Sequence, residues 1–127
     1  VKSLFHFAQR GMHPFKKSTV SWNDFENIGL RVGTIFTVED FPDAKVPAYK
    51  VWVDLGELGV KRSSAQITKL YTKHELMGKQ VICVTNFAPK QIGPFSSEIL
   101  ITGFAVGNGE VVLIQPERKI TNGLKLG

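Results

Sequence analysis

Hydrophobic and polar residues alternate along several short stretches of the chain, and a period of two predicts β-strands that bury one face. One such stretch covers residues 30–40, and the most regular one covers residues 49–55. The residues assigned to the buried faces are Leu30, Val32, Phe36 and Val38 in the first stretch and Tyr49, Val51, Val53 and Leu55 in the second. Trp52 falls on the charged face, where it is either a cap over the sheet edge or a contact for a partner.

Further strands are indicated in the second half of the chain. The nearly continuous apolar run at residues 80–87 is typical of a strand buried on both faces. An Asn-Gly pair at residues 108–109 lies between two apolar runs, which is a strong β-hairpin signal. Prolines at both ends predict that residues 89–94 form a loop. The remaining expected strands cover residues 60–67, 97–105 and 110–116.

Two short helices complete the pattern. Ser21 can cap the first helix, and Gly29 is expected to end it. Thr72 and Glu75 form a capping-box pattern for the second, which Gly78 would end. This order of strands, with a small helix between the third and the fourth, is the one expected of an oligonucleotide/oligosaccharide-binding (OB) fold. The predicted fold class is all-β: a five-stranded OB-fold barrel with short helices and a C-terminal hairpin extension.

Composition fits one domain in a chain of 127 residues. No apolar run approaches the ~20 residues that a membrane-spanning helix needs, so we expect no membrane insertion. The single cysteine, Cys83, lies inside an apolar run, which indicates a buried thiol and a cytoplasmic location. Residues 1–20 carry four basic residues and no acid, and we treat them as a basic leader of uncertain status. Residues 21–127 are then a single OB-fold domain.

The chain shows no pattern typical of an enzyme. None of its three histidines has a cysteine or carboxylate at metal-ligand spacing, and no phosphate-binding loop or nucleophile-elbow motif occurs. No nucleophile, base and oxyanion donors come together in the sequence. We therefore expect no catalytic residues, no metal and no cofactor, and we interpret the protein as a binder.

The candidate binding residues lie around the third strand. Basic side chains stand close to small polar ones there, so that a ligand backbone could approach while its charge is neutralised. The basic candidates are Lys61, Arg62, Lys69 and Lys90, and the neutral ones are Ser63, Ser64, Gln66 and Asn86. The alternative is that these lysines are solvated or protect a sheet edge.

Several separated segments carry a family resemblance: "FENIGLRVGTI", "SSAQITKLY", "GKQVICVTNFAPKQIGPFSSEIL" and "GEVVLIQP" with the closing "NGLKLG". They resemble the tRNA-binding-domain family, and closely its CsaA branch of export-related chaperones. The resemblance implies an OB-fold homodimer that binds tRNA or, in the CsaA branch, unfolded preprotein segments. It also implies a ligand face made of residues 63–67 and residues 86–98, the latter including Lys90, Ser97 and Glu98.

Dimerisation has separate support in the sequence. The side of the first helix formed by Trp22, Phe25 and Ile28, together with Val111 and Leu113, provides more apolar surface than one small barrel needs. The alternative is that these side chains fill the ends of their own barrel. The expected function is a dimeric chaperone that binds unfolded preproteins or the export machinery, with tRNA as a further partner. The alternative is a tRNA-binding accessory protein that acts on structured RNA.

Overall fold

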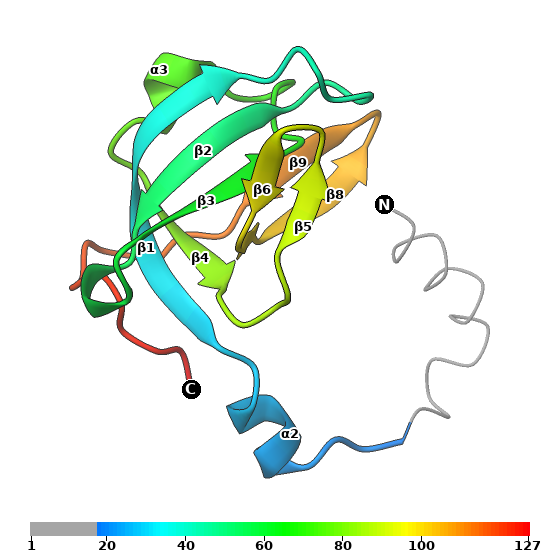
Figure 1. The fold of residues 1–127 in the computed structure, drawn as a ribbon. Helices are drawn as coiled ribbons and strands as arrows, with labels where there is room; N and C mark the ends of the chain where they lie inside the picture. Colours follow the sequence, from blue (N-terminus) through cyan, green and yellow to red (C-terminus); the bar gives the residue numbers. More distant parts are fainter. Residues whose placement is uncertain (1–17) are drawn as a thin grey trace.

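A curved antiparallel sheet of five strands forms the body of the protein in the computed structural model, which describes residues 18–127 (Figure 1). The strand order is β3-β2-β1-β4-β7. The strands are β1 (Leu30–Asp40), β2 (Tyr49–Asp54), β3 (Val60–Ala65), β4 (Gln80–Val84) and β7 (Leu100–Ile101). The Glu98 amide just before β7 donates to the Arg62 carbonyl of β3 at 2.8 Å, which nearly closes the barrel. The predicted OB-like, all-β fold is confirmed.

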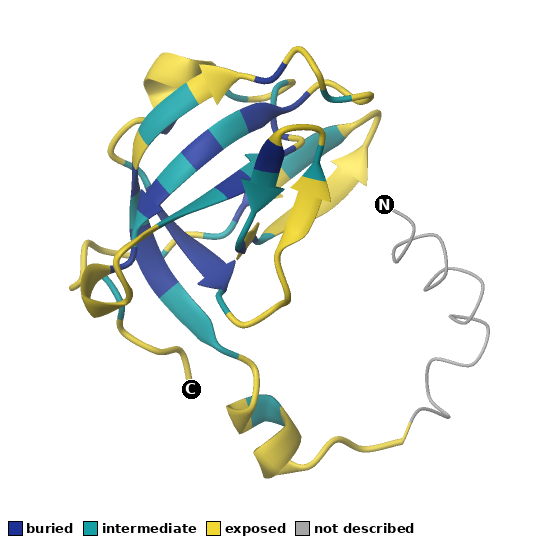
Figure 2. Cartoon of the chain, in the orientation of Figure 1, coloured by how far each residue is buried: buried dark blue, intermediate teal, exposed yellow. Residues whose placement is uncertain are grey.

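Every second side chain from residue 49 to residue 55 points inward and fills the barrel. Val51, Val53 and Leu55 are fully buried, and the residues between them are partly exposed (Figure 2). Every residue of β4 is buried, as its continuous apolar run predicted. The core also includes Ile35, Leu76 and Cys83, all with no exposed surface. Within residues 18–127, no helix is long and apolar enough to cross a membrane.

A β-bulge in β1 reverses the expected face of one residue. Ile35 pairs with Val53 and Thr37 pairs with Trp52, so Phe36 between them has no partner on β2. Phe36 is consequently 43% exposed, whereas Ile35 is fully buried. The prediction that Phe36 shares the buried face was wrong, because even spacing assumes an unbroken ladder and an inserted residue changes the phase of the alternation.

Both helices begin as the sequence predicted. Ser21 and Asp24 form a capping box for α2 (Trp22–Glu26), and Thr72 and Glu75 form one for α3 (Lys73–Leu76). The first helix ends at Glu26, before Gly29, so Gly29 is not its terminator. A Cβ on Gly29 would lie 2.7 Å from the Thr85 hydroxyl oxygen, so this glycine permits a close approach of two chain segments. A short 3-10 helix, η2 (Gly56–Leu58), links β2 to β3.

Two hairpins extend from the barrel. The first joins β8 (Gly103–Gly107) to β9 (Glu110–Leu113), and positive φ angles at Asn108 and Gly109 confirm the predicted turn. The second joins β5 (Lys90–Ile92) to β6 (Phe95–Ser97) where a loop was expected. That expectation was wrong because the prolines lie outside both strands, at the turn and before β5, and leave the ladder intact.

The C-terminal tail completes the sheet beside the first half of β1. The amide of Val32 donates to the carbonyl of Leu124 at 3.1 Å, and the amide of Gly123 donates to the carbonyl of Val32 at 2.7 Å. The tail thus occupies the edge of β1 that β2 covers further along the strand. Unpaired backbone groups on β1 are satisfied in this way.

The bulge predicts a large loss of stability on truncating one residue and a small loss on truncating its neighbour. Ile35→Ala should lower the free energy of unfolding by about 2–5 kcal/mol, because it leaves a cavity in the core. Phe36→Ala should change it by less than about 1 kcal/mol, because Phe36 is 43% exposed and lies outside the barrel core. Urea titrations of the two variants test this. A larger loss for Phe36→Ala would place the ring in the core and contradict the bulge.

Candidate ligand-binding face

Five of the predicted site residues come together where the β5–β6 hairpin meets β3. The Arg62 amide donates to Glu98 Oε1 at 3.1 Å, and the Ser64 amide donates to Ser97 Oγ at 3.0 Å. Lys90 lies opposite Ser97 in the hairpin. The hairpin therefore brings one of the predicted lysines to a position one strand, β6, away from β3.

The same contacts contradict the prediction that the backbone of β3 is open to a ligand. Backbone groups of Arg62 and Ser64 that a ligand strand could have used are bonded to Ser97 and Glu98 of the same chain. Ser63 is fully buried and its hydroxyl donates to the Ser64 carbonyl, so the prediction that its side chain meets a ligand was wrong. Ser63 pairs with Val51 and faces the core; its small size suits the barrel interior.

Other predicted residues lie apart from this junction. Lys61 pairs with Val53, which places it on the opposite side of β3 from Arg62. Lys69 donates from Nζ to the Asn108 carbonyl at 2.7 Å, at the β8–β9 turn. Gln66 is exposed just after β3. The cationic residues thus occupy more than one surface.

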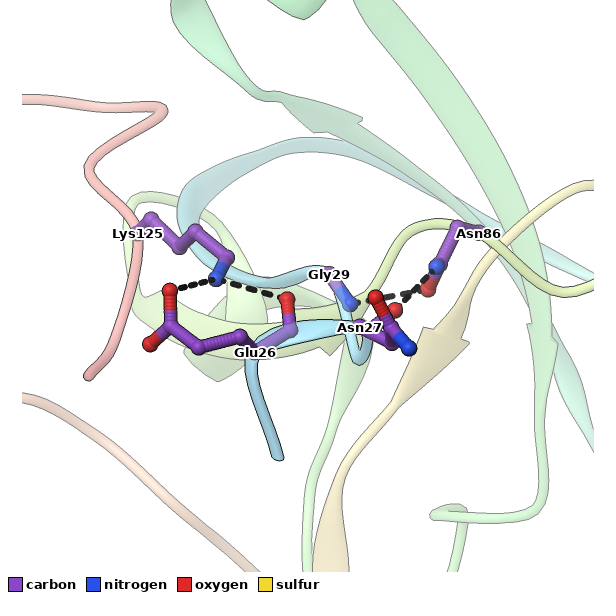
Figure 3. Close-up of polar contacts among 5 residues, drawn as sticks. All are labelled: Glu26, Asn27, Gly29, Asn86 and Lys125. Carbon is purple, nitrogen blue, oxygen red and sulfur yellow. Dashed lines mark hydrogen bonds and ion pairs between the residues drawn. The ribbon is translucent and has the colours of Figure 1, made fainter. Parts of the chain in front are cut away.

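Asn86 has a structural role at the base of α2. Its Oδ1 accepts from the Gly29 amide at 2.8 Å, and its Nδ2 donates to the Asn27 carbonyl at 2.7 Å (Figure 3). Lys125 of the C-terminal tail donates to the Glu26 carbonyl at 3.0 Å on the other side of the same segment. The two side chains together hold the end of the helix to the barrel.

A second apolar cluster, which no sequence pattern indicated, lies outside the barrel. Phe41, Ala48 and Phe95 are buried together, with Trp52 packed against them. The Phe95 ring centre lies 6.0 Å from that of Trp52 and 5.3 Å from that of Phe41. Trp52 therefore packs against Phe95 on the outer face of the sheet, as the first of its two interpretations expects. Phe41 and Phe95 were missed because neither lies in a regular alternating stretch.

Burial and surface contacts account for the pKa shifts of Cys83 and Lys73. In the stretch from residue 18 to residue 127, no three His, Cys, Asp or Glu side chains gather where they could hold a metal ion. Burial raises the pKa of Cys83 to about 12, so its thiol is protonated at neutral pH. The hydrogen bond from Lys73 to Asp40 raises the pKa of that lysine. These shifts follow from packing and a surface contact.

The fold defines a small OB-like, all-β type of domain. The family described as "Putative tRNA binding domain" matches residues 30–125, and the chain belongs to it. Methionine–tRNA ligase of Pyrococcus abyssi is 35% identical over 112 residues, or 87% of this chain. The chain spans only 15% of that ligase's length.

Within the family the chain is of the CsaA type. The crystal structure of chaperone CsaA from Bacillus anthracis is 44% identical, with a TM-score of 0.82, covering 87% of this chain and 100% of that one. CsaA chaperone protein from Picrophilus torridus is also 44% identical, with a TM-score of 0.79, covering 86% and 100%. The resemblance seen in the sequence is confirmed.

Burial of Cys83 predicts low thiol reactivity in the folded protein. A thiol reagent at pH 8 should label it slowly, and fast once urea unfolds the chain. Because the folded pKa is raised, the unfolded thiol ionises first. Its ionisation should therefore lower stability as pH rises from the ordinary thiol pKa to about 12. Fast labelling without urea would contradict the burial.

The contacts of Asn86 predict a loss of stability on its replacement. Asn86→Ala should cost about 1–2 kcal/mol, because two hydrogen bonds are lost. Asn86→Asp should cost less, since the acceptor for the Gly29 amide remains. Thermal unfolding of both variants, with tRNA affinity measured on the same samples, checks this. Weaker tRNA binding at unchanged stability would instead make Asn86 a ligand contact.

Proposed function

We propose that the protein is a CsaA-type dimeric chaperone of the cytoplasm that binds unfolded preprotein segments for export. The observation that carries this is an apolar surface on the β8–β9 hairpin, here called the hairpin patch. It consists of Phe104, Val106 and Val112, which are 63%, 56% and 41% exposed. Every residue of β8 is exposed, and among residues 18–127 this strand is paired only with β9. Exposed apolar side chains beside an open strand edge suit an extended, partly apolar chain.

A homodimer is part of this proposal. Helix α2 stands clear of the barrel (Figure 1), and its Trp22 is 69% exposed. Ile28, two residues after the helix, is 43% exposed. The ring of Phe25 packs against Trp22 at 5.5 Å between centres, so the helix presents one joint apolar side. Such a side is typical of a surface that a second subunit covers.

The proposed interface does not include Val111 or Leu113, two residues that the sequence predicted for it. Leu113 is only 8% exposed and belongs to the barrel core, and Val111 packs against that core. This burial supports the alternative, that these two side chains fill their own barrel. Their neighbour Val112 carries the outward apolar surface of β9.

The second candidate function is tRNA binding, as in an accessory protein that acts on structured RNA. It is favoured by the family's description and by the cations Arg62 and Lys90 at the junction of β3 with the β5–β6 hairpin. Ser64, Ser97 and Glu98 complete the proposed contact surface, with Lys61, Lys69 and Gln66 at greater distance.

Salt dependence separates the two candidates. A labelled unfolded preprotein peptide should bind nearly equally at ~50 and ~200 mM salt, whereas a tRNA complex should lose orders of magnitude in affinity. Binding of tRNA alone would favour the second function. The mass in solution should be twice the 14.1 kDa of one chain, and a mass of one chain would contradict the dimer.

The hairpin patch predicts the effect of a double substitution. Phe104→Ser combined with Val112→Ser should weaken peptide binding at least about tenfold, because apolar contact area is lost. Phe36→Ser, which removes an exposed ring on the bulge, is the matched control and should bind normally. Equal affinity of both variants would mean that the client binds elsewhere.

A further inference from the structure

Asparagine is followed by glycine at two positions in the chain, Asn108 and Asn122. Glycine has no side chain to shield its own amide nitrogen, so this nitrogen can attack the side-chain carbonyl carbon of the preceding asparagine. Asn-Gly is for this reason a chemically labile pair, and asparagine is a thermolabile residue in general. The two pairs have different surroundings in the fold, which predicts a different reactivity for each.

Asn108 and Gly109 are exposed at the tip of the β8–β9 hairpin. Within residues 18–127, the Asn108 side chain makes no hydrogen bond and the Gly109 amide donates to no other group. The tip is tied to the segment after β3 by a bond from Lys69 Nζ to the Asn108 carbonyl, at 2.7 Å. The turn can therefore open without disturbing the barrel core.

Asn122 and Gly123 are held by the barrel. Asn122 Oδ1 accepts from Thr34 Oγ1 at 2.7 Å and from Gln80 Nε2 at 3.0 Å. The Gly123 amide, whose nitrogen would have to attack, donates to the Val32 carbonyl at 2.7 Å. Both reacting groups are thus occupied, and these three bonds must break before the nitrogen and the side chain can meet.

We propose that Asn108 is a site of deamidation and that the fold protects Asn122 from the same reaction. The Gly109 nitrogen loses its proton and forms a bond to Asn108 Cγ, which closes a succinimide ring, and the side-chain nitrogen leaves as ammonia. Water then adds to one of the two ring carbonyls and opens the ring. Addition at Cγ gives aspartate, and addition at the main-chain carbonyl gives isoaspartate. Water is the only co-reactant, and no electrons are transferred to or from the chain.

The closed turn slows this reaction at Asn108. Its φ of 56° lies in the left-handed region that an Asn-Gly hairpin turn requires. In that conformation the Gly109 nitrogen points away from the Asn108 side chain, so the turn must open before the ring can close. The bond from Lys69 resists the opening. The rate at Asn108 should therefore depend on Lys69, and the rate at Asn122 should not.

Deamidation should change the hairpin without affecting the barrel. Either product adds a carboxylate near Lys69 and removes one unit from the formal net charge of +5. Isoaspartate also adds one carbon to the main chain of the two-residue turn. A turn of that length no longer suits the register that pairs Phe104 with Val112. The strands of the hairpin patch should then be less firmly paired.

The test incubates the full chain at ~37 °C and a pH of about 8.5, where an amide nitrogen loses its proton more readily. Trypsin cleaves after Arg118 and Lys119, so Asn108 and Asn122 fall in separate peptides for mass spectrometry. Aspartate and isoaspartate should form at position 108 at least about tenfold faster than at position 122. A sample digested before incubation is the blank, because digestion itself can deamidate asparagine.

Two variants test the part played by the turn. Lys69→Met should speed the reaction at Asn108 about threefold, because one hydrogen bond that resists opening is lost. It should leave the rate at Asn122 unchanged, and thermal unfolding checks that the variant is folded. Asn108→Gly suits the same positive φ and should give no acidic form of the hairpin peptide. Equal rates at Asn108 with and without the lysine would contradict the opening step.

Unfolding provides the internal reference. In guanidinium chloride the rate at Asn122 should rise until the two sites differ by less than about threefold, because only the fold protects it. In the isoaspartyl form, recognised by a methyltransferase specific for isoaspartate, the amide hydrogens of β8 and β9 should exchange faster and those of β4 should not. Equal rates at the two asparagines in the folded chain would overturn the protection of Asn122. An unreacted Asn108 in the folded chain, after a time in which the unfolded chain reacts, would overturn the site itself.

Discussion

The backbone amides and carbonyls on the outer edge of β3 need hydrogen-bond partners for the barrel to form. A sheet of five short strands leaves one row of amides and carbonyls unpaired at each end, and buried groups of this kind cost several kcal/mol if they stay so. Ser97 and Glu98 meet this need by bonding to the backbone of Arg62 and Ser64. Because the same two residues end the β5–β6 hairpin, closing the barrel also places the hairpin over the outer face of the sheet.

That placement decides which surfaces remain for ligands. Phe95 covers the outer face where OB-folds commonly bind their ligands, so only its margins are accessible. Lys50 and Arg62 lie at those margins, and the hairpin patch lies on a separate two-stranded sheet. Cationic and apolar binding surfaces are therefore carried by different elements, which allows one small domain to offer both.

Sequence patterns predicted the fold well wherever the determining interactions are between residues close in the chain. Alternation on β2, the apolar run of β4, the two capping boxes and the Asn108-Gly109 turn each depend on residues close in the chain. The prediction that Phe36 is buried failed because a bulge depends on how β1 must bend between β4 and β2. Phe95 and Phe41 were missed because their contact joins residues 54 positions apart, which periodicity cannot detect. The charged candidates were identified by their residue type. Which side of the sheet each one faces could be determined only from the strand register.

The tail beside β1 has a consequence for how the molecule assembles. The Arg31 side chain donates to the carbonyl of Gly123, a residue 92 positions later, so the edge of the first strand is covered by a segment that is made much later than the strand itself. Contacts this distant in sequence form late and slow the folding of β proteins. Until they form, β1 offers a bare edge to any neighbouring chain. A protein proposed to hold unfolded clients thus passes through a stage in which it resembles one.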